Sequence, residues 1–160
     1  MQLEEQLLML AHIILASVLA GIIGFERERL DKPAGIRTQM IVAGAVTFLV
    51  FLGEKIVRHF VEAGLAEHID TDPTRIIQAI VVGISFIGAG TVLQVAKEHK
   101  IRYLTTAATI LMSTGIGIGI ALKQYILTIG VTIFVLIVNY LIRRFAMKLE
   151  KSKKGDDFSE

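Results

Sequence analysis

The sequence predicts an all-α membrane protein folded as a bundle of five transmembrane helices, and two observations support this fold class. The chain is strongly apolar, because 53% of its 160 residues are hydrophobic and 20% are charged. The charges stand between five uncharged blocks that are apolar all round rather than along one stripe, which excludes a water-soluble helical bundle. At about 1.5 Å per residue, such blocks suit a hydrocarbon core of roughly 30 Å. The blocks are residues 7–25, 38–53, 76–96, 103–122 and 124–142.

The lysines and arginines predict the orientation of the bundle. Thirteen of the 17 fall in the connections after the first and third blocks or in the C-terminal tail, and the other four lie on the opposite side. Because positively charged loops stay in the cytoplasm, we expect the N-terminus outside and the C-terminus in the cytoplasm. The chain then divides into a five-span transmembrane domain, residues 1–145, and a short charged cytoplasmic tail, residues 146–160.

The first block ends in the most distinctive connection of the chain, GIIGFERERLDKPAGIRTQ. Charges of opposite sign alternate from Glu26 onward, and the turn at residues 33–35 can bring Arg37 back toward them. We therefore predict that Glu26 or Glu28 pairs with Arg37 and that this polar cluster at the membrane edge is the functional site, since a low dielectric strengthens such pairs. The alternative is that these charges are separate anchors in the headgroup region.

The connection from residue 54 to residue 75 is the longest on the predicted outer side. Its apolar residues recur at helical spacing up to residue 65, which predicts a short amphipathic helix on the outer interface. Asp72 followed by Pro73 predicts a turn or helix start, with Pro73 at the first helical position. Mg²⁺ and Ca²⁺ prefer oxygen ligands, so weak attraction of these cations to the acidic residues is one interpretation. Because nothing here resembles a coordination loop, we favour the other, a solvated surface, and predict no metal site.

Residues 76–96 are the stretch around which we expect the chain to be organised. Its small residues include Gly83, Gly88 and Gly90, and glycine lets a neighbouring backbone approach closely or lets a helix unwind beside a cavity. We expect Gly88 and Gly90 to lie against another helix or an unwound segment, where no side chain fits.

The fourth block carries hydroxyl side chains that can bond to their own helix or to a neighbour. Gly115 and Gly119 in the same block form a G-x-x-x-G pair, which is typical of helix packing and less often of an ion path. His12, alone among ionisable side chains in the first block, is predicted to be a hydrogen-bonded packing residue. The hydroxyl residues of the fourth block are Thr105, Thr106, Thr109, Ser113 and Thr114.

Several classes of function find no support in the sequence. None of the five blocks contains Asp, Glu, Lys or Arg, so the usual sign of a proton relay or charge-coupled pump is missing. The chain has no phosphate-binding GxxxxGK[ST] loop, no HExxH, no nucleophile elbow and no cysteine. We therefore expect neither an enzyme nor a bound cofactor, and we interpret the basic charge as a topology signal rather than a nucleic-acid footprint.

Three stretches taken together resemble the signature segments of the MgtC/SapB membrane protein family: GIIGFERERLDKPAGIRTQMIVAGA, DPTRIIQAIVVGISFIGAG and RYLTTAATILMSTGIGIGIA. The resemblance covers roughly residues 10–140, with Tyr103 where the family typically has glycine. It implies a bacterial inner-membrane protein associated with adaptation to low magnesium and with virulence, in a short form without the cytoplasmic domain of longer members. The candidate functional cluster on these segments comprises Glu26, Arg27, Glu28, Arg37, Thr38 and Arg75. The candidate packing or path-lining residues are Gly83, Gly88, Gly90, Thr105, Thr106, Gly115 and Gly119.

Two functions fit these features. The first is a regulatory or interaction protein in the lipid bilayer, assembled as a homo-oligomer and docking other membrane proteins through its small-residue faces. The second is an oligomeric transporter or channel for Mg²⁺, protons or a small solute, with its path beside residues 83–90. The lack of charge inside the blocks favours the first function, while the hydroxyl groups of the fourth block and the glycines of the third favour the second.

Overall fold

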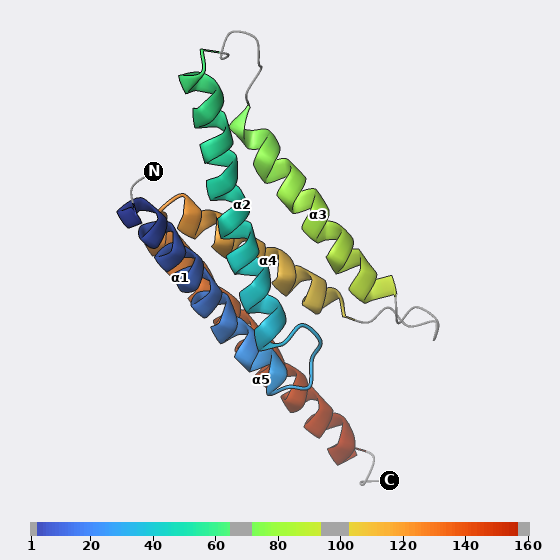
Figure 1. Ribbon diagram of the computed structural model, residues 1–160. Helices are drawn as coiled ribbons and strands as arrows, with labels where there is room; N and C mark the ends of the chain where they lie inside the picture. Colours follow the sequence, from blue (N-terminus) through green and yellow to red (C-terminus); the bar gives the residue numbers. More distant parts are fainter. Residues whose placement is uncertain (1–2, 65–71, 94–102, 157–160) are drawn as a thin grey trace.

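The computed structural model describes residues 3–64, 72–93 and 103–156, and this part of the chain forms five helices. Each helix contains a stretch long and apolar enough to cross a membrane, so the prediction of an all-α fold with five helices able to span a membrane is confirmed. The start of α1 and the end of α5 lie at opposite ends of the bundle (Figure 1), whereas the side that faces the cytoplasm stays a prediction. The helices are α1 (Leu3–Glu28), α2 (Ile36–Glu62), α3 (Pro73–Leu93), α4 (Leu104–Ala121) and α5 (Tyr125–Asp156).

Helix α2 continues without a break to Glu62, so residues 54–62 form its last turns. The prediction of a separate interfacial helix in this segment is therefore wrong. The end of an apolar block marks where contact with lipid tails ends, whereas a helix continues for as long as its backbone hydrogen bonds continue. An ion pair of 2.8 Å joins Arg58 to Glu54 one turn earlier in this extension. Helix α5 likewise continues past the apolar block to Asp156, so the boundary drawn at residue 145 falls inside a helix.

Helix α3 begins at Pro73, the position predicted from the sequence. One carboxylate oxygen of Asp72 accepts hydrogen bonds from the backbone N–H of Thr74 (2.9 Å) and from its hydroxyl (2.7 Å). Asp72 is therefore the N-cap of the helix, and these two bonds lower the pKa of its carboxyl group. Capping of α3 is therefore sufficient to explain why an aspartate stands at position 72.

Helix α4, and not α3, occupies the centre of the bundle. Half of the most apolar stretch of α4 is buried (50%), compared with 11% for α3. Three clusters of buried apolar residues hold the bundle together, and α4 contributes Ile110, Ile116 or Ile120 to each of them. The expectation that the chain is organised around residues 76–96 is wrong: α3 lies at the edge, and one of its ends diverges from α2 (Figure 1). In a bilayer apolarity does not select the central helix, because lipid tails are as apolar as the protein.

Glycines make the closest helix crossings in α1, α2 and α4. A methyl group added at Gly24 would lie 2.6 Å from the Cα atom of Ile36, where α1 meets the start of α2. A methyl group added at Gly117 would lie 2.6 Å from the carbonyl oxygen of Ala43, where α4 crosses α2. Only a hydrogen atom fits at these points, so the backbones approach closely enough for dispersion to stabilise the bundle.

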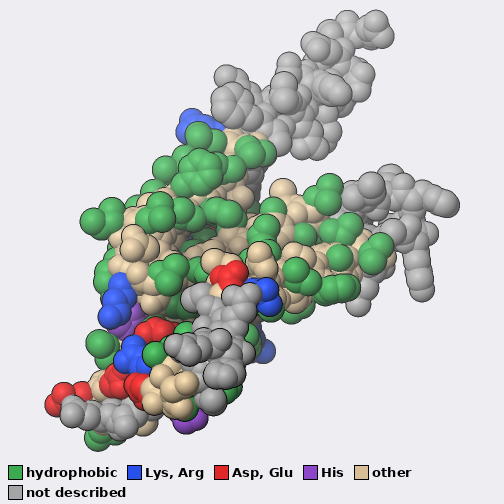
Figure 2. Space-filling model, turned by 90° about the horizontal axis from the view of Figure 1, so that it is seen from above, with side chains coloured by type: hydrophobic (Ala, Val, Ile, Leu, Met, Phe, Trp, Pro, Cys, Tyr) green, Lys and Arg blue, Asp and Glu red, His purple; other side chains and the backbone are tan. Residues whose placement is uncertain are grey.

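Hydrophobic side chains form most of the outer surface, as a transmembrane protein requires. In Figure 2 they cover most of the face in view, and the charged side chains gather in a smaller part of it. Large apolar side chains on α3 and α5 are well exposed, among them Phe86 (76%) and Ile126 (91%). These surfaces suit contact with lipid or with another membrane helix.

Candidate functional site

Arg27 is the one charged side chain among the residues described as buried, with 4% of its surface exposed. It stands in the last turn of α1, and its Nη2 atom donates a hydrogen bond across the bundle to the hydroxyl of Thr106 on α4. Its Nε–H is buried and has no hydrogen-bond partner among the described residues. A buried guanidinium is costly unless its charge is compensated, so this position is a functional candidate on physical grounds.

Glu26 and Glu28, the neighbours of Arg27 in the chain, form hydrogen bonds with other partners than the predicted Arg37. Glu26 accepts a hydrogen bond of 2.8 Å from the side-chain amide of Asn139 on α5. Glu28 accepts one of 3.0 Å from the backbone N–H of Ile36 and so satisfies a free donor at the start of α2. Among the described residues neither glutamate forms an ion pair, and the side chain of Arg37 is exposed. The predicted pairing of Glu26 or Glu28 with Arg37 is therefore wrong.

Gln39 is the centre of a polar network inside the bundle and is fully buried. Its amide nitrogen donates a hydrogen bond of 3.1 Å to the carbonyl oxygen of Ala34, which fixes the connection between α1 and α2. Its amide oxygen accepts a hydrogen bond of 2.6 Å from Ser113 of α4, and the hydroxyl of Thr109 lies 3.5 Å from its nitrogen. One amide side chain thus ties α2 to both the connection and α4.

Hydroxyl groups form further hydrogen bonds in the interior of the bundle. Thr109 donates to the carbonyl oxygen of Thr106, which brings the network next to Arg27. Farther into the bundle, the Thr47 hydroxyl lies 2.9 Å from the carbonyl oxygens of both Ala43 and Gly117. Apart from the Nε–H of Arg27, these interior polar groups are bonded to one another or to backbone carbonyls, which is the condition for burying them in a membrane.

A cavity of about 360 Å³ lies beside Arg27, at the end of the bundle where the connection between α1 and α2 passes. Its lining combines two cationic side chains, one carboxylate, two neutral polar groups and two apolar side chains. The lining residues are Glu26, Arg27, Leu30, Lys32, Thr105, Asn139 and Ile142.

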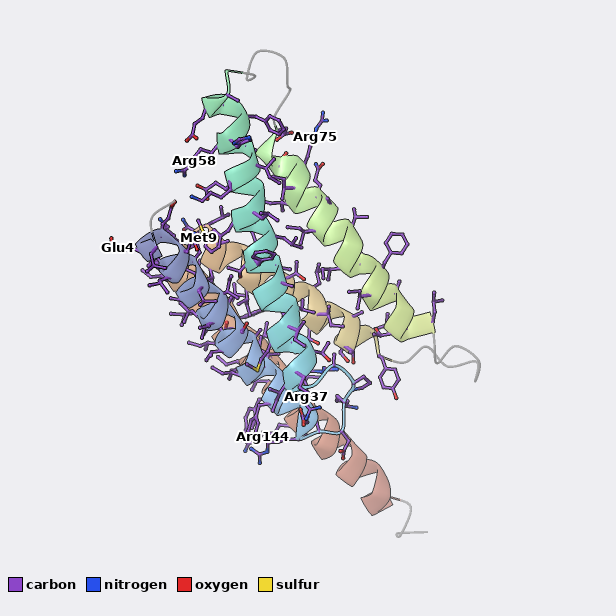
Figure 3. The ribbon with its side chains drawn as sticks, in the orientation of Figure 1. Glu4, Met9, Arg37, Arg58, Arg75 and Arg144 are labelled. Atoms are coloured by element: carbon purple, nitrogen blue, oxygen red, sulfur yellow. The ribbon has the colours of Figure 1, made fainter. Side chains whose placement is uncertain are left out.

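Two members of the predicted polar cluster lie on the surface at the same end of the bundle, and one lies at the other end. Arg37 and Thr38 are exposed in the first turn of α2. Arg75 is exposed beside the start of α3, and Figure 3 shows it at the end opposite to Arg37. The cluster predicted from the sequence is thus not one site, since Arg75 cannot act together with the residues near Arg27.

Three of the predicted packing glycines have open space around them within this chain. Among the described residues, no other part of the chain comes within 4 Å of a methyl group added at Gly83, Gly90 or Gly115. The close contact expected at Gly90 is therefore not made within the part of the chain that the structure describes. A glycine on a helix face shows that a close approach is possible, but the partner is set by how the helices pack.

The other two predicted glycines contact neighbouring helices. A methyl group added at Gly88 would lie 3.4 Å from the Cβ atom of Ala107, so α3 and α4 touch through small residues there. A methyl group added at Gly119 would overlap the hydroxyl of Thr128 on α5. Helices α3 and α4 are thus in ordinary contact at Gly88, whereas α4 and α5 approach each other very closely at Gly119.

His12 is buried near the other end of α1, between two hydrogen-bond partners. Its Nδ1 atom lies 2.7 Å from the carbonyl oxygen of Leu8, and its Nε2 atom lies 2.5 Å from the hydroxyl of Tyr125. A carbonyl oxygen only accepts, so Nδ1 donates to Leu8, and the second ring nitrogen is bonded to the Tyr125 hydroxyl. This agrees with a packing role. Within the described ranges no group of three His, Asp or Glu side chains is arranged to hold a metal ion.

Sequence reasoning missed the roles of Gln39 and Asn139. Both carry a side-chain amide inside an apolar block, and an amide at that depth needs a partner within the protein. That signal indicates an interior position, but it does not identify the partner. Tyr103 has a left-handed backbone with φ 68°, a conformation that favours glycine, and it stands where the family pattern typically has glycine.

Comparison with known proteins agrees with the resemblance read from the sequence. The family model described as "MgtC family" matches residues 13–148. A protein named "Protein MgtC" from Salmonella typhimurium is 35% identical over 153 residues, which cover 93% of this chain and 60% of that protein. "Protein MgtC" from Brucella abortus is 37% identical over 138 residues, covering 84% of this chain and 51% of that protein.

A third relative is a Haemophilus influenzae protein described as uncharacterized. It is 40% identical over 114 residues, which cover 71% of this chain and 47% of that protein. This chain thus spans about half of the length of the relatives it matches. No solved structure matches. The five apolar helices and the family match over most of the sequence lead to one conclusion: this chain is a multi-pass membrane protein that belongs to the MgtC family.

Proposed function

We propose that this chain is a non-enzymatic regulatory protein of the bacterial inner membrane, used in adaptation to low magnesium and in virulence, and that it acts through contacts between membrane helices. Its similarity to proteins named MgtC supports the physiological setting. The proposed contact surface lies on α3, the helix whose apolar stretch is the least buried of the five described.

One observation carries this proposal: α3 has a continuous face of small and apolar residues that the rest of the described chain leaves uncovered. Residues spaced by three, four and seven positions share one side of a helix. Ala79, Gly83, Phe86, Ile87 and Gly90 have this spacing, and all five are exposed. We call these five residues the open face of α3. In this face the bulky Phe86 and Ile87 lie between Gly83 and Gly90.

The occupant proposed for the open face of α3 is the same face of a second copy. The face is uncharged along its whole length, so no charge has to be desolvated when two copies meet. Bulky Phe86 and Ile87 of one copy can fill the space above Gly83 and Gly90 of the other, and small residues of this kind drive helix association in lipid. A homo-oligomer built in this way is the form proposed to regulate other membrane proteins.

The double substitution of Gly83 and Gly90 by leucine is expected to abolish both assembly and function, because two isobutyl groups would hold the helices apart. Growth in low magnesium would be scored in a strain that relies on this protein, at matched expression, together with chemical cross-linking of the oligomer in membranes. Gly130→Leu on α5 is the matched control, since that glycine also has open space around it.

The outcomes separate the possibilities. Loss of cross-linked oligomer and of growth in the α3 variant alone supports the proposal. Loss of growth with an intact oligomer would mean that the face docks another membrane protein instead of a second copy. Normal growth of the α3 variant would refute the proposed role of this face.

The alternative function is an ion or small-solute conductor, and the polar interior is the observation that favours it. The hydroxyl and amide groups from Thr106 to Thr47 run along the bundle. Against conduction, these groups are bonded to one another and to backbone carbonyls rather than left free to replace the water shell of an ion. Purified protein in liposomes is therefore expected to pass neither Mg²⁺ nor protons, and a flux above that of empty liposomes would favour the conductor.

A further inference from the structure

The cavity beside Arg27 lies at the level at which apolar spans give way to polar connections. Ile142 is the last residue of the apolar stretch of α5, Thr105 is the second residue of α4, and Arg27 is one residue from the end of α1. The end of α1, the start of α4 and the end of the apolar stretch of α5 thus meet at one cavity, and this level marks the membrane edge, where the headgroups of lipids lie. A ligand in this cavity would contact the headgroup layer on one side.

The charges that line the cavity favour a ligand with a single negative charge. Arg27 and Lys32 are cationic, and Glu26 is the only acid in the lining. Glu26 is held by the side-chain amide of Asn139, and among the described residues neither Arg27 nor Lys32 belongs to an ion pair. The lining therefore carries a formal charge of plus one, which a phosphodiester monoanion would neutralise.

The donors of the cavity suit phosphate oxygens. Arg27 is 4% exposed, and its Nε–H is a buried donor without a partner in the described chain. A guanidinium presents donors in a planar fork that fits phosphate oxygens, and a lysine ammonium adds a mobile point charge. Thr105 supplies a hydroxyl on the same wall. A phosphate at the membrane edge would thus give the buried guanidinium the ion pair that it lacks among the described residues.

We propose that this cavity binds the phosphate group of a membrane lipid headgroup. The apolar lining favours a lipid over free phosphate, because Leu30 and Ile142 can contact the glycerol and the first acyl carbons. Ile142 is 64% exposed, so the cavity borders the lipid-facing surface of α5. This site is at the edge of α1, α4 and α5, and its lipid binding does not depend on the open face of α3.

The test uses the full chain, purified in a maltoside detergent and stripped of phospholipid. Thermal unfolding would be followed during titration with phosphatidylglycerol, with a diacylglycerol that lacks phosphate, and with inorganic phosphate. Because a ligand that binds only the folded state raises the Tm, phosphatidylglycerol should raise it in a saturable way. Diacylglycerol should not, and inorganic phosphate should act only at much higher concentration.

Two of the possible results would overturn the proposal. An equal Tm shift with diacylglycerol would mean that the phosphate group is not recognised. An equal shift with inorganic phosphate at the same concentration would mean that the site takes free phosphate rather than a lipid. A shift confined to phosphatidylglycerol supports the lipid site.

Variants connect the Tm shift to this cavity. Lys32→Gln should weaken the apparent affinity for phosphatidylglycerol several-fold, since Lys32 is exposed at the rim and its removal leaves the fold unchanged. Arg58→Gln is the matched control, because it removes the same charge at the opposite end of the bundle (Figure 3). Arg27→Lys keeps the charge but loses the fork, so the affinity should fall about tenfold or more. If Lys32→Gln and Arg58→Gln both bind like the unmodified chain, the site is not in this cavity.

Discussion

Gly117→Ala is expected to lower the free energy of unfolding by about 1–3 kcal/mol, which is the usual cost of overfilling a packed core. The added methyl group would lie 2.6 Å from the carbonyl oxygen of Ala43 and 2.9 Å from the Cβ atom of Val46. A backbone oxygen cannot rotate out of the way as a flexible side chain can, so α2 and α4 would have to separate. They would also stretch the hydrogen bond from Thr47 to Gly117. The measurement is thermal unfolding of the purified protein in detergent.

Gly115→Ala is the matched control for this prediction. It introduces the same methyl group on the same helix, two residues away, where no other described part of the chain lies within 4 Å. Alanine is the better helix former, so the Tm should stay unchanged or rise slightly. Equal losses of Tm in the two variants would show that the close crossing at Gly117 does not determine stability.

Gln39→Leu is expected to destabilise the fold by about 2–4 kcal/mol, although leucine is apolar and of similar size. The change leaves the carbonyl oxygen of Ala34 and the hydroxyl of Ser113 without their partner, and each buried group left unsatisfied costs roughly 1–3 kcal/mol. The connection that ends at Ala34 should loosen as well. Thermal unfolding reports the loss of stability, and limited proteolysis of the connection between α1 and α2 reports the loosening.

Two comparisons make the Gln39 prediction specific. Gln78→Leu makes the same exchange at an exposed position of α3 and should not lower the Tm. Adding Ser113→Ala to Gln39→Leu removes one of the orphaned groups, so the double variant should be more stable than the sum of the two single effects predicts. Strict additivity would contradict the hydrogen bond between these two side chains.

The sequence was sufficient for the number of helices and for their approximate bounds. Long uncharged blocks can be stable only where lipid surrounds them, and a backbone in lipid has to bond within its own helix. The start of α3 at Pro73 was likewise predictable, because an aspartate before a proline is a local capping signal. The continuation of α2 to Glu62 was not predictable, since an amphipathic stretch after a span can form a new helix or continue the same helix.

The candidate site was predictable in its location but not in its contacts. The charged connection pointed to Arg27, and the hydroxyl groups of the fourth block pointed to Thr106, and the two side chains do meet. The partners of Glu26 and Glu28 were mispredicted. Charge complementarity favoured Arg37, yet one glutamate binds an amide of α5 and the other binds a backbone N–H. Each of these partners depends on how helix ends are arranged in three dimensions.

By itself, the sequence determined that this chain crosses a membrane as five helices, because the cost of burying charge and unpaired backbone groups in lipid is a local property of each segment. Only the tertiary structure decided which helix is central and which glycines are in contact. The hydrophobic effect transfers apolar segments into the bilayer, but it does not determine which of them pack against one another there. That sorting follows from close crossings such as Gly117 on Ala43 and from bonds such as Gln39 to Ser113, and these bring together residues far apart in the chain.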